Sequence, residues 1–348
     1  MDGIDVAVIE TDGQSLTWSG PTRTYPYDPL LRGRLDDAVR RPDGPADEIA
    51  ALEADLTDAH AVAVEDFVAT EMPRDRTVDL VGLHGHTLVH KPDEGVTRQL
   101  GDGARLASRL KLDVVFDFRS ADMAAGGEGA PMAPAYHQLL AQQLEKPVVV
   151  LNLGGVGNVT WIGENVLLAF DTGPGNGLID DWVRDNAGIP FDQDGRLAAA
   201  GSVDQTVLDR LLSHPYFDRP PPKSLDRLDF GLEALEGMGV EDGAATLTAF
   251  TAASVERAQV YFPAPPAHWL VTGGGRRNPT LMRTLRTRLA MELEPIESVG
   301  ADGDGLEAQA FAYLAVRSVL GLPTSFPGST GVSAPTVGGR LVRPDDAS

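Results

Sequence analysis

Apolar residues in the middle of the chain fall into short runs that each end at glycines. Residues 148–153 are apolar with one exception, as in a strand buried on both faces, and they lead into a pair of glycines. A second apolar run, residues 166–170, ends at Asp171 and opens another glycine turn. Apolar residues then recur at helical spacing over 178–183. The pattern predicts two strands, with the second glycine turn at the N-terminus of a helix.

The same pattern recurs later in the chain. Residues 269–272 lead into three glycines, 273–275, and leucines then follow at helical spacing. A helix is predicted over 304–321, with Asp304 as its N-cap and Gly321 as its C-cap. Further strands are predicted at 4–9, 15–18, 78–83 and 113–118, and further helices at 47–70 and 246–261.

Glycine turns of this kind suit a phosphate ligand. Backbone amides at a helix N-terminus attract anions, and glycines let a phosphate approach the main chain closely. A single carboxylate at the mouth of such a turn, here Asp171, is a group that manages protons during phosphoryl transfer. The alternative is that Asp171 only caps the following helix. Because none of the turns meets the Gly-x-Gly-x-x-Gly fingerprint of dinucleotide folds, a phosphotransferase is the predicted class.

Length and composition narrow the class further. A chain of 348 residues, with 42% hydrophobic residues, 38 glycines and 25 prolines, is typical of a two-domain α/β protein. The net charge of −22 argues against nucleic acid or an anionic membrane as the main partner. It favours a surface adapted to high salt, and the alternative is acidity kept for solubility. No apolar run approaches twenty residues and no secretory signal is visible, so a cytoplasmic protein without a membrane span is predicted.

Several polar residues are candidates for other chemistry. Three histidines, His84, His86 and His90, could suggest a metal site, but the segment fits a substrate-facing loop better because no carboxylate lies in register with them. Arg119, at a predicted strand end, is either an anion or sugar clamp or the partner of Asp122. The chain has no cysteine, which excludes disulfides, thiolate metal sites and a cysteine nucleophile.

Eight segments, taken in order, resemble those of the anhydro-N-acetylmuramic acid kinase family. The resemblance runs from the first residues to about Gly331. It is carried by residues 2–5, 85–92, 117–131, 152–158, 170–176, 223–224, 272–279 and 307–312.

The resemblance implies a fold, a reaction and a cofactor set. The fold is α/β, the two-lobed ASKHA architecture of actin-like ATPases and sugar kinases, with a central cleft. Its lobes are expected at 1–135 and 136–348, with the C-terminal tail returning to the first lobe as one option. The implied reaction uses ATP and Mg²⁺ to open a 1,6-anhydro amino sugar, 1,6-anhydro-N-acetylmuramic acid, and to phosphorylate its 6-oxygen. The family also implies a small-molecule sugar partner and a homodimer.

The resemblance assigns roles to particular residues, although it gives no metal ligands. Asp171 matches the base that activates water for attack on the anomeric carbon. Positions expected near the sugar are His84, Arg119, Thr172 and Glu307. Positions expected to bind ATP are Asp2, Gly3, Gly154, Gly155, Gly173, Gly175, Gly273, Gly274 and Gly275.

Two departures from the family pattern shape the expectations. The family has an apolar strand and a Gly-Thr-Ser turn before the Asp2-Gly3 pair, so a chain truncated at its first strand is expected. His86 stands where the family usually has glutamine, which changes a donor on the substrate side. Two alternatives therefore stay open: a catalytically impaired nucleotide- or sugar-binding homologue, and a kinase of a different amino sugar.

Overall fold

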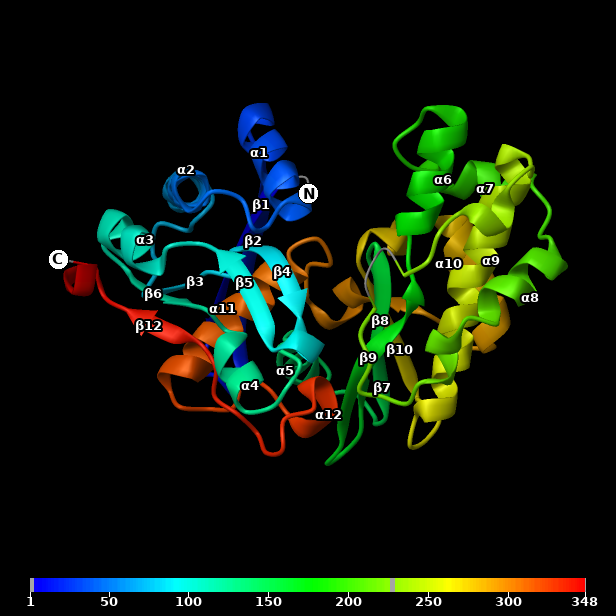
Figure 1. Cartoon of the computed structure of the whole chain (residues 1–348). Helices are drawn as coiled ribbons and strands as arrows, with labels where there is room; N and C mark the ends of the chain where they lie inside the picture. The colour runs from blue at the N-terminus through cyan, green and yellow to red at the C-terminus, as the bar shows by residue number, and fades with distance from the viewer. Residues whose placement is uncertain (1–2, 226–228, 348) are drawn as a thin grey trace. The chain divides into compact units, whose positions relative to one another are not determined.

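The computed structural model describes residues 3–225 and 229–347, and the chain forms two compact units (Figure 1). The first unit comprises residues 1–140 and 305–348, and the second comprises 141–304. Both units combine helices with β-sheet, which confirms the predicted α/β class. Within the described ranges, no helix is long and apolar enough to cross a membrane.

The second unit is built on a five-stranded mixed sheet in the order β11-β10-β7-β8-β9. Its central strand β7 pairs in parallel with β10 and antiparallel with β8. The strands are β7 (Val148–Leu153), β8 (Val156–Ile162), β9 (Leu167–Pro174), β10 (His268–Thr272) and β11 (Glu294–Pro295). The strands predicted from the three apolar runs before the glycine turns are therefore confirmed.

Five α-helices of the second unit lie in the residues that the structure describes. They are α6 (Gly177–Ala187), α7 (Arg196–Ala200), α8 (Gln205–Leu212), α9 (Val240–Ala258) and α10 (Pro279–Leu289). Helix α9 contributes to two apolar clusters, Val255 to one with Phe170 and Trp269, and Phe250 to one with Trp182. Its alanines, threonines and one glycine permit this close packing, because small side chains let neighbouring elements approach.

Three small sheets are found in the described part of the first unit. A hairpin joins β1 (Gly3–Thr11) and β2 (Leu16–Pro26), which include the strands predicted at 4–9 and 15–18, and β2 runs further than predicted. A second hairpin joins β4 (His86–Lys91) and β5 (Val96–Leu100). The third sheet has the order β12-β6-β3, formed by β3 (Leu80–Gly82), β6 (Asp113–Phe116) and β12 (Arg340–Val342).

Seven α-helices belong to this unit in the described residues, and α11 is central to it. They are α1 (Pro29–Arg40), α2 (Ala46–Thr70), α3 (Gly103–Leu110), α4 (Ser120–Ala124), α5 (Pro134–Leu140), α11 (Leu306–Val319) and α12 (Pro327–Thr330). Helix α11 packs on both β1 and β3, and Gly82 lies directly under the Phe311 carbonyl, where a side chain would not fit. Residues 305–348 therefore fold with the chain's beginning.

The predicted caps of α11 are wrong. Gly305 occupies the N-cap, because the carboxylate of Asp304 pairs instead with Arg276, at 3.0 Å, and with Arg277. Leu320 occupies the C-cap, and Gly321 follows it in the left-handed region at a φ of 66°. The helix therefore ends one position earlier than predicted, and Gly321 follows its C-cap.

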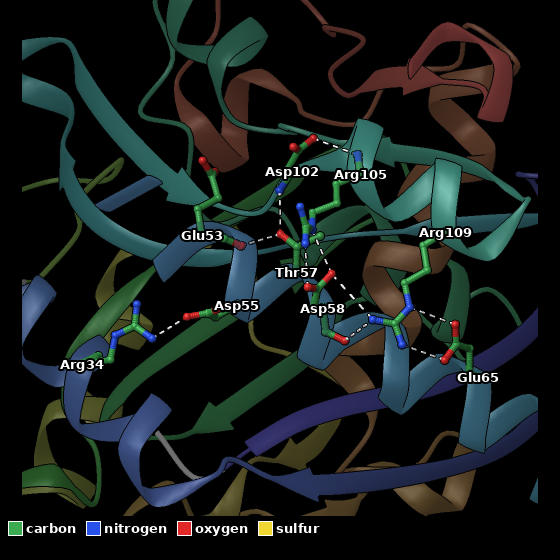
Figure 2. A network of polar contacts seen from close by, with 9 residues as sticks. All are labelled: Arg34, Glu53, Asp55, Thr57, Asp58, Glu65, Asp102, Arg105 and Arg109. Carbon is green, nitrogen blue, oxygen red and sulfur yellow. Dashed lines mark hydrogen bonds and ion pairs between the residues drawn. The ribbon is translucent and has the colours of Figure 1, made fainter. Parts of the chain in front are cut away.

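Charged side chains attach helix α3 to helix α2 (Figure 2). Arg105 forms two bonds with Asp58, of 2.7 and 2.8 Å, and Arg109 forms two with Glu65, of 2.9 and 3.0 Å. Asp102 caps α3 with its side chain, and its backbone amide donates to Thr57 on α2. Exposed ion pairs each contribute little to stability. The contact between the two helices therefore depends more on the two-pronged geometry of the arginine pairs, and on the cap formed by Asp102, than on net charge.

Candidate active site

Three glycine turns lie at one edge of the second unit's sheet. Strands β7 and β10 are parallel, and β9 runs the same way because both β7 and β9 are antiparallel to β8. Their carboxyl ends therefore point to the same edge, where residues 154–155 follow β7, residues 273–275 follow β10, and residues 173–175 form the end of β9. Ligands of α/β sheets bind outside the carboxyl ends of strands, so this edge is the candidate nucleotide-binding region.

The first two turns are bonded to each other. The amide of Asn176 donates to the Gly154 carbonyl at 2.7 Å, and the amides of Gly175 and Gly177 donate to the Gly155 carbonyl at 3.0 and 3.1 Å. The expectation of bare amides at the start of α6 is therefore wrong for these three residues. By contrast, a Cβ added at Gly155 would meet nothing within 4 Å, so this turn keeps open space on one side.

The three-glycine turn does not begin a helix directly. Gly274–Arg277 forms a short 3₁₀ turn, and α10 starts at Pro279 with Asn278 as its N-cap. Gly273 adopts a φ of 78° against Leu153, where only glycine fits, whereas Gly274 faces open space. The largely buried Arg276 donates to the Gly273 carbonyl at 3.1 Å and so fixes the turn from behind.

Asp171 lies on β9, opposite Asn158 of β8, and is held by the segment 216–225. Its Oδ2 accepts from the Leu225 amide at 2.8 Å, its backbone amide donates to the Lys223 carbonyl at 3.1 Å, and its carbonyl accepts from the Tyr216 hydroxyl at 2.5 Å. The alternative that Asp171 only caps the next helix is wrong, because Asn176 is the N-cap of α6. The carboxylate is oriented and only partly buried.

Thr172 is buried beside Asp171. Its Oγ1 has no hydrogen-bond partner among the described residues. Gly157 lies opposite, and a Cβ there would come within 2.8 Å of that hydroxyl oxygen. A buried hydroxyl without a partner is costly, so a bound ligand is the natural acceptor or donor for it.

Lys223 is a residue of this region that sequence reasoning noted only as part of a motif. It is 4% exposed, and its Nζ lies 4.6 Å from the ring centroid of Tyr216 and 4.7 Å from that of Tyr261. Burial lowers the pKa of Lys223 to about 8, although the aromatic rings attract the charged form. The signal available in the sequence was rarity, since the chain has only four lysines.

In the first unit, the structure brings Arg119 and His84 together. Arg119 Nη2 lies 2.8 Å from His84 Nε2, and its Nη1 donates to the Gly129 carbonyl at 2.7 Å. An arginine only donates, so His84 Nε2 accepts and Nδ1 carries the proton. Burial, with Arg119 as the next cause, lowers the pKa of His84 to about 3, so the ring is neutral. Arg119 Nε has no partner among the described residues.

The loop that receives Arg119 is fixed by Asp122. One Asp122 oxygen accepts from the Gly129 amide at 2.7 Å, and the other accepts from the Thr330 hydroxyl at 2.6 Å. The alternative in which Arg119 pairs with Asp122 is therefore wrong. Asp122 is fully buried, so it holds the loop against which Arg119 is placed.

Glu307 lies in the first turn of α11 and is exposed to solvent. The three histidines form no metal centre, since no group of three His, Asp or Glu side chains among residues 3–225 and 229–347 could hold an ion. Burial lowers the pKa of both His86 and His90.

The predicted site residues thus divide between the units. His84, Arg119 and Glu307 belong to the first, whereas Asp171, Thr172 and the glycines from 154 to 275 belong to the second. Gly3 starts β1, and Asp2 lies outside the described residues.

Comparisons with known proteins agree on one family. The family model described as anhydro-N-acetylmuramic acid kinase matches residues 1–343. The anhydro-N-acetylmuramic acid kinase of Paramagnetospirillum magneticum is 53% identical over 98% of this chain and 96% of its own length, and that of Rhizorhabdus wittichii is 50% identical over 99% and 96%.

Similarity to solved structures is weaker. A ROK family glucokinase from Streptomyces griseus, solved with glucose and AMPPNP, aligns with 90% of this chain and 96% of its own. Its sequence identity is 15% and the TM-score is 0.40, too low for residues to be compared one by one.

Proposed function

The chain belongs to the anhydro-N-acetylmuramic acid kinase family, and from that premise we propose that it opens 1,6-anhydro-N-acetylmuramic acid with water and phosphorylates the 6-oxygen with ATP. The product is N-acetylmuramic acid 6-phosphate. The observation that carries the proposal is Asp171, oriented by the Leu225 amide at the sheet edge where three glycine turns meet.

Asp171 acts as the general base. It takes a proton from water while the water oxygen bonds to the anomeric carbon and the bond from that carbon to the 6-oxygen breaks. The 6-oxygen then bonds to the γ-phosphorus of ATP, and ADP leaves. The backbone of Asp171 accepts from the Tyr216 hydroxyl and donates to the Lys223 carbonyl, and the Leu225 amide donates to its carboxylate. These bonds keep the carboxylate in one orientation, as a base that must meet one water requires.

The glycine turns are proposed to receive the nucleotide. Gly155 and Gly274 face open space, so a phosphate can approach the main chain there, whereas Gly175 and Gly273 are crowded and shape the turns. Mg²⁺ accompanies ATP in this proposal, neutralising charge on the phosphates that supply most of its ligands. No protein ligand is assigned to the ion.

Four residues are proposed to bind the sugar: His84, Arg119, Thr172 and Glu307. The guanidinium of Arg119 presents its N–H donors in a fixed planar arrangement. Its Nε and the Thr172 hydroxyl are buried and have no hydrogen-bond partner among the described residues, so each can bond to the sugar. Neutral His84 offers an Nδ1–H donor, since its Nε2 already accepts from Arg119. Glu307 supplies an acceptor for sugar hydroxyl groups.

An assay in ¹⁸O-labelled water tests the reaction. Protein, ATP, Mg²⁺ and 1,6-anhydro-N-acetylmuramic acid should yield ADP and a sugar phosphate with one labelled oxygen on the anomeric carbon and none on phosphorus. Label in the phosphate instead would mean simple ATP hydrolysis. Ligand binding by calorimetry without turnover would support the catalytically impaired homologue, and turnover with another anhydro sugar alone would support a different amino sugar.

Replacing Asp171 tests the base. Asp171→Asn should lower kcat by about 10²–10⁴ while nucleotide affinity stays unchanged, because general-base catalysis contributes about that factor. Asp185→Asn, on the exposed face of α6, is the matched control and should keep full activity. Retention of kcat in Asp171→Asn would remove Asp171 from this role.

A further inference from the structure

The orientation of Asp171 depends on two short stretches that come later in the chain. In the first, the 3₁₀ turn Pro215–Asp218, the Tyr216 hydroxyl donates to the Asp171 carbonyl at 2.5 Å. In the second, the Lys223 carbonyl accepts from the Asp171 amide, and the Leu225 amide donates to the Asp171 carboxylate. The carboxylate therefore keeps its orientation only while both stretches stay in place.

The ammonium of Lys223 connects these two stretches. Its Nζ donates to the Tyr216 carbonyl at 3.3 Å, so a side chain of the second stretch bonds to the backbone of the first. The same Nζ lies 4.6 Å from the ring centroid of Tyr216 and 4.7 Å from that of Tyr261. An ammonium within about 6 Å of a ring centroid is attracted by the face of the ring, so both rings add to the hydrogen bond.

Tyr261 is itself fixed by residues of the same region. Its hydroxyl donates to the carbonyl of Phe217 at 3.0 Å, in the turn that carries Tyr216. Its ring meets that of Phe170 edge to face, with the two ring centroids 5.8 Å apart, and Phe170 directly precedes Asp171 on β9. The position of the ammonium is therefore defined by rings on two sides.

A positive charge at this position is costly to the folded chain. Lys223 is 4% exposed, and burial, followed by the charges of Arg219 and Arg257, lowers the pKa of Lys223 to about 8. The carboxylates of Asp218 and Asp171 oppose this shift. Most molecules still carry the charge at neutral pH, because the pKa lies above that pH. Groups shifted in this way gather at functional sites, which points to a role for the ammonium beyond packing.

We propose that Lys223 is a positioning residue for the reaction. Its ammonium ties the turn that carries Tyr216 to the second stretch, and so keeps the Asp171 carboxylate in the orientation that the attacking water meets. Lys223 does not touch the reacting atoms but acts through the hydrogen bonds that both stretches make with Asp171. The inference rests on the proposed role of Asp171 as the base.

Steady-state kinetics of Lys223→Met test this role in the full-length chain. Methionine keeps an unbranched side chain but has neither charge nor N–H. We expect kcat to fall by about 10²-fold and the KM values for ATP and the sugar to change less than about twofold, because the lost interaction acts on the base and not on substrate binding. Lys111→Met, at an exposed lysine, is the matched control and should keep full activity. A parent-like kcat in Lys223→Met, or a raised KM with kcat unchanged, would overturn the proposal.

A chemical rescue separates the charge of Lys223 from its packing. Because the chain has no cysteine, Lys223→Cys introduces a unique thiol. Alkylation with 2-bromoethylamine, in urea before refolding, gives an arm of the length of lysine that ends in an ammonium, and 2-bromoethanol gives an equally long arm that ends in a neutral hydroxyl. The amine arm should restore most of the lost kcat and the hydroxyl arm little of it. Equal recovery with both arms would overturn the proposal, and the parent chain treated in the same way controls for refolding.

Hydrogen exchange tests the same link without turnover. In Lys223→Met, peptic peptides should show the amides of Asp171 and Leu225 exchanging at least about tenfold faster than in the parent chain, while residues 148–151 stay slow, because only the stretches around Asp171 are released. Unchanged exchange at both amides would overturn the proposal even if kcat falls. If the parent chain shows no turnover, the proposed reaction fails, and the exchange rates alone then decide whether Lys223 holds the two stretches together.

Discussion

Strand β7 in the second unit and strand β1 in the first carry similar apolar runs, Val148–Leu151 and residues 6–9, but they have different surroundings. All four β7 residues are 0% exposed, whereas those of β1 remain half-buried. The difference follows from pairing, because β7 has β10 and β8 on its two edges and β1 has only β2. Burial of a strand is thus decided by its neighbours as much as by its own sequence.

The two units also support their candidate site residues differently. In the second, backbone bonds between turns, such as that from Asn176 to Gly154, fix the sheet edge beside Asp171. In the first unit, side chains fix the site residues instead. Asp122 accepts from the Gly129 amide and so fixes the loop, and Arg119 donates to the Gly129 carbonyl. Substitutions that truncate side chains should therefore affect the first site locally and the second mainly through its core.

The sharpest test compares the same substitution in the two units. Leu151→Ala should lower the free energy of unfolding by about 2–5 kcal/mol, because a fully buried leucine leaves a cavity in a closed sheet. Leu80→Ala in β3 should cost about 1 kcal/mol, since that side chain already borders a cavity and is partly exposed. Urea unfolding of both variants measures the difference, and equal losses would contradict the comparison.

Removing the Asp122 carboxylate should produce the next largest effect. Asp122→Ala leaves the buried Gly129 amide and Thr330 hydroxyl without their acceptor, at a cost of about 1–3 kcal/mol in stability. The loop that fixes Arg119 is then released, so KM for the sugar should rise about tenfold with a smaller change in KM for ATP. Thr330→Ser keeps the hydroxyl and serves as the control. A parallel rise in both KM values would indicate a general loss of structure.

Hydrogen exchange compares the strands without mutation. Amides of residues 148–151 should exchange at least about tenfold more slowly than those of residues 6–9, because strands paired on both edges open only with their unit. Mass spectrometry of peptic peptides measures both rates in one sample. Fast exchange in β7 would contradict the comparison.

The smallest expected effect concerns the pH dependence due to Lys223. Its pKa of about 8 in the folded chain lies below that of an unfolded lysine, so between about pH 8 and 10 the unfolded chain binds more protons. As pH rises through that window, this residue should therefore raise the free energy of unfolding by up to about 1.4 kcal/mol per pH unit. Below the window, the destabilisation caused by the buried charge is fully present.

Lys223→Met should lack this gain. Urea unfolding at pH 8, 9 and 10, followed by emission from Trp161, Trp182 and Trp269 of the second unit, measures the difference from the parent chain. Lys91→Met, an exposed lysine, is the control and should keep the parent slope. If Lys223→Met keeps the parent slope of the free energy of unfolding against pH, the charge of Lys223 does not destabilise the folded chain.

The sequence predicted the elements whose signal is local. The continuous apolar run of β7 and its glycines specify a buried strand and a turn within a few residues, and both are confirmed. Asp304 was predicted as a cap because its local position fits one, but Arg276, 28 residues earlier, pairs with it instead. The hydrogen bonds of Asp171 with Lys223 and Tyr216 likewise join residues about 50 positions apart in the sequence. Such contacts depend on the folded chain path, which local patterns do not contain.

The return of residues 305–348 to the first unit has a consequence for the order of events on the ribosome. The second unit is one continuous stretch, 141–304, and is complete once residue 304 has emerged. The first unit must wait for α11, which covers β1 and β3, and for β12. At about 5–20 residues per second, synthesis of these last 44 residues takes roughly 2–9 s. During that interval the earliest strands of the nascent chain lack their covering helix, and a chaperone that binds extended apolar segments has its best opportunity there.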